Sequence, residues 1–179
     1  TIAFHLFKVN EFLDIYFKID KLGILFAMLA STLWIFTAFY SFSYMTREGK
    51  EKRFFIFFTF TLGITISIAF AGNLFTLYIF YELLTLSTFP LVIHSGSSEA
   101  LESGKKYLIY SFGGATLVLL GMILLFSISQ NMAFVELGVF KDIAINNPNL
   151  MLSIYMILFL GFGVKAALVP FHSWLPSAM

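Results

Sequence analysis

The feature that most limits the fold of this chain is a series of long apolar runs separated by polar segments. The runs cover residues 22–45, 54–71, 74–93, 107–129 and 150–170. A helix rises about 1.5 Å per residue, so roughly 20 apolar residues cross a hydrocarbon core of about 30 Å. The sequence therefore predicts an all-α transmembrane fold, in which residues 20–179 form one repeat of five spans.

Composition supports a membrane protein and excludes several classes of function. Hydrophobic residues make up 59% and charged residues 12% of the chain, whereas soluble domains have about 45–50% and about 25%. The formal net charge of +1 gives no field that would attract nucleic acid. The chain has no cysteine, and its three histidines lack metal- or haem-binding spacing. We expect no cofactor, no metal site and no catalytic centre of its own.

Two stretches are too polar to cross the membrane. Residues 1–19 mix aromatic with charged side chains, and we interpret them as an interfacial segment, either a strand or a short amphipathic piece. Because of their charges we do not expect these residues to be a signal peptide. Residues 131–149 carry Glu136, Lys141 and Asp142 and are predicted to be a loop with one short interfacial helix.

The distribution of Lys and Arg predicts the orientation of the spans. One side of the predicted bundle carries Arg47, Lys50, Lys52, Arg53, Lys105 and Lys106. The other side carries Lys8, Lys18, Lys21 and Lys141. Cytoplasmic loops are enriched in Lys and Arg, so the first side is expected to be cytoplasmic and the amino terminus outside. We expect a multi-pass protein of a cell membrane, namely a prokaryotic plasma membrane.

Two charged residues, Glu82 and Lys165, lie well inside the predicted spans. A charge at membrane depth costs roughly 2.5–3.5 kcal/mol on insertion scales, so each needs a partner or a hydrated cavity. A buried carboxyl and a buried amine that face each other can change protonation at small cost, which is what a proton relay requires. Alternatively, Glu82 only joins helices by hydrogen bonds, or Lys165 extends its amine to the interface.

Helical spacing places Tyr78 and Thr85 on the same face as Glu82, where they are expected to orient the carboxyl group. Pro170 is expected to break the fifth span. His172 follows the break, on the same face as Lys165 if the helix resumes. It is expected to pass protons or, alternatively, to pack in the break.

Lys106 stands at the mouth of the fourth span. It is either part of the proton path or a loop charge that sets the orientation of the chain.

Three stretches resemble the antiporter-like proton-channel subunits. Residues Ala71–Leu91 resemble the glutamate-bearing helix of that family, and Gly163–Met179 resemble its broken lysine helix. Residues Ile19–Ala27 are similar to the aspartate-led entry to its third transmembrane helix. The family includes large membrane subunits of respiratory complex I, subunits D and A of Mrp-type sodium/proton antiporters, and subunits of membrane-bound hydrogenases.

The resemblance implies a fold and a function. Family members have about fourteen helices in two inverted five-helix repeats, and this chain matches the first repeat. We therefore expect half of an inverted-repeat fold, as a fragment, a split subunit or part of a longer protein. By the same resemblance Glu82 and Lys165 form half of a proton channel, and His172 belongs to the motif that follows. The implied partners are the lipid bilayer, H⁺ or Na⁺, and the other membrane subunits of a multi-subunit complex. In some members of the family this complex is an oxidoreductase, such as NADH-quinone oxidoreductase or hydrogenase.

Two other functions remain open at this point. The chain is alternatively a structural membrane subunit without its own ion path, in which the charged residues only fix helix packing. It is alternatively a quinone-handling redox subunit.

Overall fold

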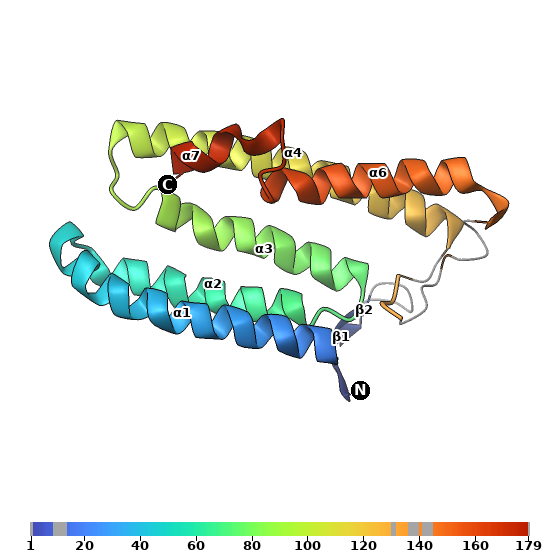
Figure 1. Cartoon of the computed structure of the whole chain (residues 1–179), viewed down its shortest axis with the longest axis horizontal. Helices are drawn as coiled ribbons and strands as arrows, with labels where there is room; N and C mark the ends of the chain where they lie inside the picture. Colours follow the sequence, from blue (N-terminus) through green and yellow to red (C-terminus); the bar gives the residue numbers. More distant parts are fainter. Residues whose placement is uncertain (1, 9–13, 130–131, 136–139, 141–144, 179) are drawn as a thin grey trace.

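The computed structural model describes residues 2–8, 14–129, 132–135, 140 and 145–178. In these parts the chain forms a bundle of long helices with a β-hairpin at one end (Figure 1). The long helices are α1 (Lys21–Glu48), α2 (Glu51–Ala69), α3 (Leu74–Val92), α4 (Ser98–Ile128) and α6 (Pro148–Lys165). All five are long and apolar enough to cross a membrane, which confirms the prediction of a five-span helical membrane protein.

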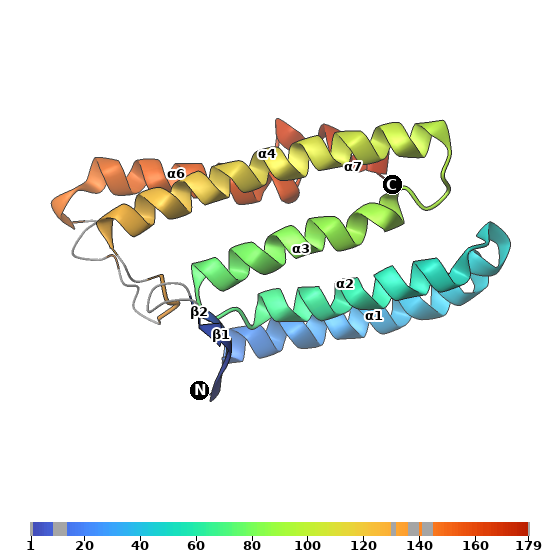
Figure 2. The same ribbon diagram turned by 180° about the vertical axis from the view of Figure 1, so that it is seen from behind.

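Helix α3 occupies the middle of the bundle. Figures 1 and 2 show α1 and α2 side by side on one flank of α3, and α4 and α6 side by side on the other. Apolar side chains of α1 such as Phe36 and Phe39 are 68% and 70% exposed, as expected of a helix whose outer face contacts lipid. The side chains of Thr76 and Thr85, by contrast, are fully buried. The polar groups of α3 therefore face the interior of the bundle.

The hairpin is fixed to the turn that starts α3. Strands β1 (Ile2–Lys8) and β2 (Asp14–Ile19) pair antiparallel, so the strand form is the one adopted in this segment. Asn73 Nδ2 donates to Asp14 O at 2.8 Å, while Asn73 Oδ1 caps α3 by accepting from Thr76 N at 2.7 Å. Burial, reinforced by the Asp14 carboxylate, raises the pKa of Tyr16. The phenol thus keeps its proton and donates to Gly72 O at 2.8 Å.

About half of the polar stretch 131–149 lies outside the described residues. Glu136, Lys141, Asp142 and the short interfacial helix predicted there belong to this part. Among the residues that are described, Met132 O accepts from Leu74 N at 3.1 Å, and Phe134 N donates to Gly72 O at 3.0 Å. This end of the stretch therefore joins the hairpin and the start of α3.

Helix α4 begins well before the predicted start at residue 107. Ser97 Oγ caps it by accepting from Ala100 N at 3.1 Å. The negative charge of Glu99 in the first turn interacts favourably with the positive end of the helix dipole. The prediction of a polar loop up to Lys106 was wrong, because it followed hydropathy alone. Residues 98–106 include Ala, Leu, Glu and Lys, which are strong helix formers whether or not they are apolar.

Helix α6 ends at Lys165 and not at Pro170 as predicted. Leu168 N donates to Gly163 O at 2.9 Å, and Ala167 N donates to Val164 O at 3.1 Å. Ala167 has a φ of 54°, so these bonds form a Schellman stop with alanine in the position that usually holds glycine. The fifth helix is broken as expected, but a backbone turn breaks it before the proline is reached.

The chain continues beyond the stop along α4. Val169–Pro170 is a cis peptide bond, residues Phe171–Trp174 form a 3₁₀ turn, and α7 (Leu175–Ala178) lies against α4 (Figure 1). Trp174 is buried, and its Nε1 donates to Val164 O in the last turn of α6 at 2.9 Å. The two halves of the broken helix are thus tied together across the break.

Glycines allow α4 and α6 to approach closely. A Cβ atom added to Gly114 would lie 2.8 Å from Gly161 O and 2.9 Å from Val164 Cβ. A Cβ atom added to Gly161 would lie 2.8 Å from Val118 N. Small residues at such contacts let backbones pack directly against each other, which is a main source of helix association in membranes.

We predict that Gly114→Ala separates α4 from α6 and destabilises the protein by about 1–3 kcal/mol, as overpacking typically does. Gly113→Ala is the matched control, since an added Cβ there meets nothing within 4 Å. Thermal unfolding in detergent should show a lower midpoint for Gly114→Ala only. Equal midpoints for the two variants would contradict the close contact.

Candidate functional site

The amine of Lys165 is held against one face of α3. Lys165 Nζ donates to Thr85 Oγ1 at 2.6 Å and to Tyr81 O at 2.7 Å. It also lies 3.9 Å from the centroid of the Tyr81 ring, which is a favourable cation–π position. Tyr81 and Thr85 stand four residues apart on α3 and so share a face. Three uncharged groups from a neighbouring helix therefore stabilise a lysine inside a membrane-spanning bundle.

The Schellman stop determines where this amine lies. Because α6 ends at Lys165, the amine stands at the negative end of the helix dipole, which favours a positive charge. The nearby carbonyls are satisfied by other donors, since Val164 O accepts from Trp174 Nε1 and Gly161 O accepts from Tyr81 OH at 3.3 Å. Lys165 can therefore direct its own hydrogen bonds across to α3.

The backbone of Ala167 is strained in this turn. A left-handed conformation costs an L-residue other than glycine roughly 1–2 kcal/mol. Such conformations persist where the surrounding structure holds them, and they are frequent at functional sites. Here the bonds that Leu168 and Trp174 make with the last turn of α6 hold the conformation.

Glu82 lies near the lysine without pairing with it. Among the described residues no ion pair joins Glu82 to Lys165. Glu82 Oε1 is buried and has no hydrogen-bond partner in the described part of the chain. The charges of the two groups nevertheless interact electrostatically. The structure thus shows an amine that donates its hydrogen bonds to α3 and a carboxyl group that interacts with it electrostatically.

The two residues expected to orient Glu82 occupy different positions. Thr85 is fully buried and accepts from Lys165, so it lies against the amine. Tyr78 packs on the apolar cluster that contains Leu74 and Ile154, and its phenol is close enough to Glu82 to interact with its charge. Thr85 therefore contacts the lysine, while Tyr78 remains the neighbour of the carboxyl group.

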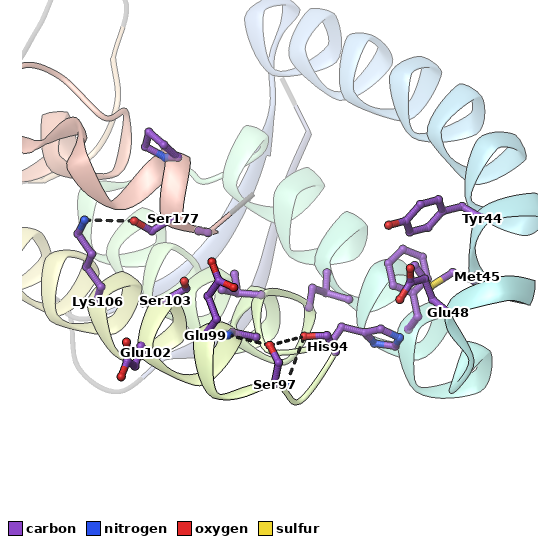
Figure 3. Close-up of a pocket in the computed structure, with 17 residues that line it drawn as sticks. Tyr44, Met45, Glu48, His94, Ser97, Glu99, Glu102, Ser103, Lys106 and Ser177 are labelled. Atoms are coloured by element: carbon purple, nitrogen blue, oxygen red, sulfur yellow. Dashed lines mark hydrogen bonds between the residues drawn. The ribbon is translucent and has the colours of Figure 1, made fainter.

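His172 and Lys106 lie apart from this group. His172 is exposed in the 3₁₀ turn, and its ring has no hydrogen-bond partner among the described residues. Lys106 donates to Ser177 Oγ at 3.2 Å and so joins α4 to α7 (Figure 3). Pro170 is exposed beyond the Schellman stop. Of the predicted site residues, the structure gathers Glu82, Lys165, Thr85 and Tyr78.

A polar cavity of about 800 Å³ lies at the end of the bundle that carries the α1–α2 and α3–α4 turns (Figure 3). It is bordered by residues of α1, α3, α4 and α7. The acidic, lysine and histidine side chains that line it are Glu48, His94, Glu99, Glu102 and Lys106. His94 Nε2 lies 3.1 Å from Gly49 O and links the α3–α4 turn to the α1–α2 turn. No group of three potential metal ligands is found in the described part of the chain.

Sequence reasoning missed Tyr81 and Trp174 as parts of the site. Tyr81 contributes a backbone carbonyl and a ring face to Lys165, and neither contribution leaves a sequence pattern. Trp174 stood within a resembling stretch, but its bond to a carbonyl of α6 depends on the turn between them. The four-residue spacing of Tyr81 and Thr85 was the one available signal.

Comparison with known proteins finds one matching family and several similar proteins. Residues 71–179 match the family described as NADH:quinone oxidoreductase/Mrp antiporter, TM. Hydrogenase-4 component B of Escherichia coli (strain K12) is 28% identical over 170 residues, which cover 94% of this chain and 25% of that protein. A putative antiporter subunit mnhA2 of Staphylococcus epidermidis is 31% identical over 166 residues, 90% of this chain and 20% of that protein. The Na(+)/H(+) antiporter subunit A1 of Staphylococcus aureus (strain Newman) is 29% identical over 168 residues, 93% of this chain and 20% of that protein. The chain spans about a fifth to a quarter of these curated relatives.

We predict that Thr85→Val destabilises the protein by about 1–3 kcal/mol, because the Lys165 amine loses one of its acceptors in the interior. Thr85→Ser keeps the hydroxyl and should retain most of the stability. Thr65→Val is the matched control, since Thr65 Oγ1 donates only within its own helix, to Thr61 O at 2.8 Å.

Thermal unfolding in detergent measures the difference among these variants. For a chain of this size, each kcal/mol corresponds to roughly 2–4 °C in the midpoint. A Thr85→Val protein as stable as Thr65→Val would show that the hydroxyl does not support the lysine.

Proposed function

Because the chain belongs to the NADH:quinone oxidoreductase/Mrp antiporter transmembrane family, as its sequence resemblance predicted, we propose that it forms part of an ion-translocating membrane subunit that moves protons. The observation that supports this most is the position of Lys165. Its amine is held inside a spanning bundle by Tyr81 and Thr85, which are uncharged. An amine without a fixed counter-ion can gain or lose a proton while its hydrogen-bonding partners stay in place.

In the proposed mechanism Lys165 exchanges the proton and Glu82 holds it. When protonated, the amine donates to Thr85 Oγ1 and Tyr81 O and faces the Tyr81 ring. After it releases a proton, the neutral amine keeps an N–H donor for Tyr81 O, and its lone pair can accept from the Thr85 hydroxyl. The charge on Glu82 acts on Lys165 through space, so a change of protonation at one group alters the free energy of protonation at the other.

The chain works within a larger membrane complex in this proposal. Its relatives are named as a component or as subunits, and it corresponds to a limited part of their length. By analogy with the family, it is the first of two inverted repeats. His172, exposed beyond the helix break, then hands the proton to the second repeat, and Lys106 joins the path at the cavity. The ion is H⁺, with exchange against Na⁺ in an Mrp-type complex.

The proposed location is a prokaryotic plasma membrane with the amino terminus outside. The α1–α2 turn carries Lys50, and Arg47 and Arg53 flank it at the same end of the bundle. The hairpin lies at the opposite end (Figure 1). The enrichment of Lys and Arg in cytoplasmic loops supports placing the turn inside the cell.

A structural role is the second candidate, and one observation favours it. The bonds of Lys165 to Tyr81 and Thr85 join α6 to α3, and they would do so in a complex that moves no ions. The two candidates differ in what happens when the charges are removed but the complex still assembles.

We predict that the double variant Glu82→Gln, Lys165→Met lowers proton transport by the assembled complex at least about tenfold, because a positioned acid or base contributes roughly 10²–10⁴-fold to proton transfer. Transport is measured in proteoliposomes with a pH-sensitive dye, after the amount of intact complex has been equalised. The matched control, Glu51→Gln with Lys52→Met, removes the same charges from the exposed first turn of α2, outside the lining of the cavity. Wild-type transport by the Glu82–Lys165 double variant would favour the structural role.

A further inference from the structure

Hydroxyl groups join α3 to α4 on the cavity side of the lysine. Thr88 Oγ1 lies 2.5 Å from Tyr107 OH, so these side chains share a short hydrogen bond between the two helices. Tyr107 is 4% exposed, and its ring packs against Trp174 with centroids 5.3 Å apart. The pair is therefore shielded, and Trp174 connects it to the last turn of α6 through Val164 O.

This pair lies close to the acceptors of Lys165. Thr88 follows Thr85 by one turn of α3, and its hydroxyl lies 3.2 Å from Thr85 O. Thr85 Oγ1 in turn accepts from Lys165 Nζ. The hydrogen bonds thus form two short segments. One runs from Lys165 Nζ to Thr85 Oγ1, the other joins Thr88 to Tyr107, and one gap lies between the two threonine hydroxyls.

Helices α3 and α4 run antiparallel and are aligned by the Thr88–Tyr107 bond, so one turn from this pair on each helix stand Thr85 and Ser111. The side chain of Ser111 is 1% exposed, and its Oγ has no hydrogen-bond partner in the described part of the chain. On α4 it stands one turn after Tyr107 and three residues before Gly114, whose added Cβ would lie 2.9 Å from Val164 Cβ. Ser111 is thus placed between the Thr88–Tyr107 pair and the turn of α6 that carries the lysine.

An unpartnered hydroxyl in such a position indicates bound water. Leaving a buried polar group without a hydrogen bond costs about 1–3 kcal/mol. Internal waters typically make 2–4 hydrogen bonds to buried polar groups of this kind. Ser111, Thr85 and the Thr88–Tyr107 pair offer hydroxyl partners from two helices.

The other end of the path reaches the polar cavity. Ser103, one turn before Tyr107 on α4, lines the cavity, as do Leu91 and Val92, which follow Thr88 by one turn on α3. Residues 176–178, just after Trp174, line it from the opposite side. The Thr88–Tyr107 pair therefore lies one helical turn away from residues of α3 and α4 that line the cavity.

We infer that a water bound by Ser111 connects Thr85 with the Thr88–Tyr107 pair and completes a proton path from the cavity to the Lys165 amine. This inference rests on the proposed function and names the route by which protons reach its lysine. Neutral Lys165 takes a proton through Thr85 Oγ1, which takes one from the water. The water is resupplied through Thr88 and Tyr107 from solvent in the cavity. Each oxygen gains one proton and gives one up, so only Lys165 changes its charge.

Tyr107→Phe tests the path, because it removes one hydroxyl and leaves the ring against Trp174. We expect proton transport by the assembled complex in proteoliposomes to fall at least about tenfold, with a changed solvent isotope effect. Ser111→Val should have a similar effect, and Ser111→Thr, which restores the hydroxyl, should recover transport. Thr116→Val is the control on the same helix, since Thr116 is exposed and donates to Gly113 O at 2.8 Å.

Failure of the path and failure of the proposed function give different results. If Tyr107→Phe and Ser111→Val transport at the wild-type rate while Lys165→Met abolishes transport, the path is wrong and the proposed function stands. If Lys165→Met also transports normally, the proposed function is wrong and the path falls with it. Where Tyr107→Phe fails to assemble, the contrast between Ser111→Val and Ser111→Thr decides, because recovery by threonine alone supports the path and equal loss in both overturns it.

Discussion

The structure depends on how a lysine is accommodated inside a membrane-spanning bundle. A charge at that depth costs roughly 2.5–3.5 kcal/mol unless it finds partners. Lys165 finds them in a carbonyl, a hydroxyl and an aromatic face, all supplied by two residues of α3. Because Glu82 lies near but does not pair with the amine, the charge is supported without being fixed to a counter-ion. A lysine held in this way can exchange protons, whereas a lysine in a fixed ion pair only joins helices.

The rest of the bundle serves to deliver the amine to this position. The Schellman stop ends α6 at Lys165, with Ala167 held at a φ of 54°. Glycines on α4 and α6 bring the two backbones into contact, so that α6 is held close beside α4. Trp174 then ties the segment beyond the break back to α6 and covers the Thr88–Tyr107 pair. Local backbone geometry, helix packing and the polar groups between α3 and α4 thus converge on one side chain.

The sequence predicted the features that depend on hydropathy. Five spans follow from five apolar runs, and Lys165 and Glu82 stand out because a charge in such a run is costly. The start of α4 could not be predicted in this way, since residues 98–106 are polar yet form helix. The end of α6 was hidden because alanine, and not glycine, occupies the left-handed position. The acceptors of Lys165 were also hidden, because spacing placed Thr85 beside Glu82 and a backbone carbonyl leaves no pattern.

The most direct test of this account is the density of Lys165 in the membrane-embedded complex, determined by cryo-electron microscopy in lipid nanodiscs at a resolution that shows lysine side chains. We expect α6 to end at Lys165, and Nζ to lie within hydrogen-bonding distance of both Tyr81 O and Thr85 Oγ1. A helix that runs unbroken to Pro170, or an amine that points to lipid or bonds directly to Glu82, would contradict it.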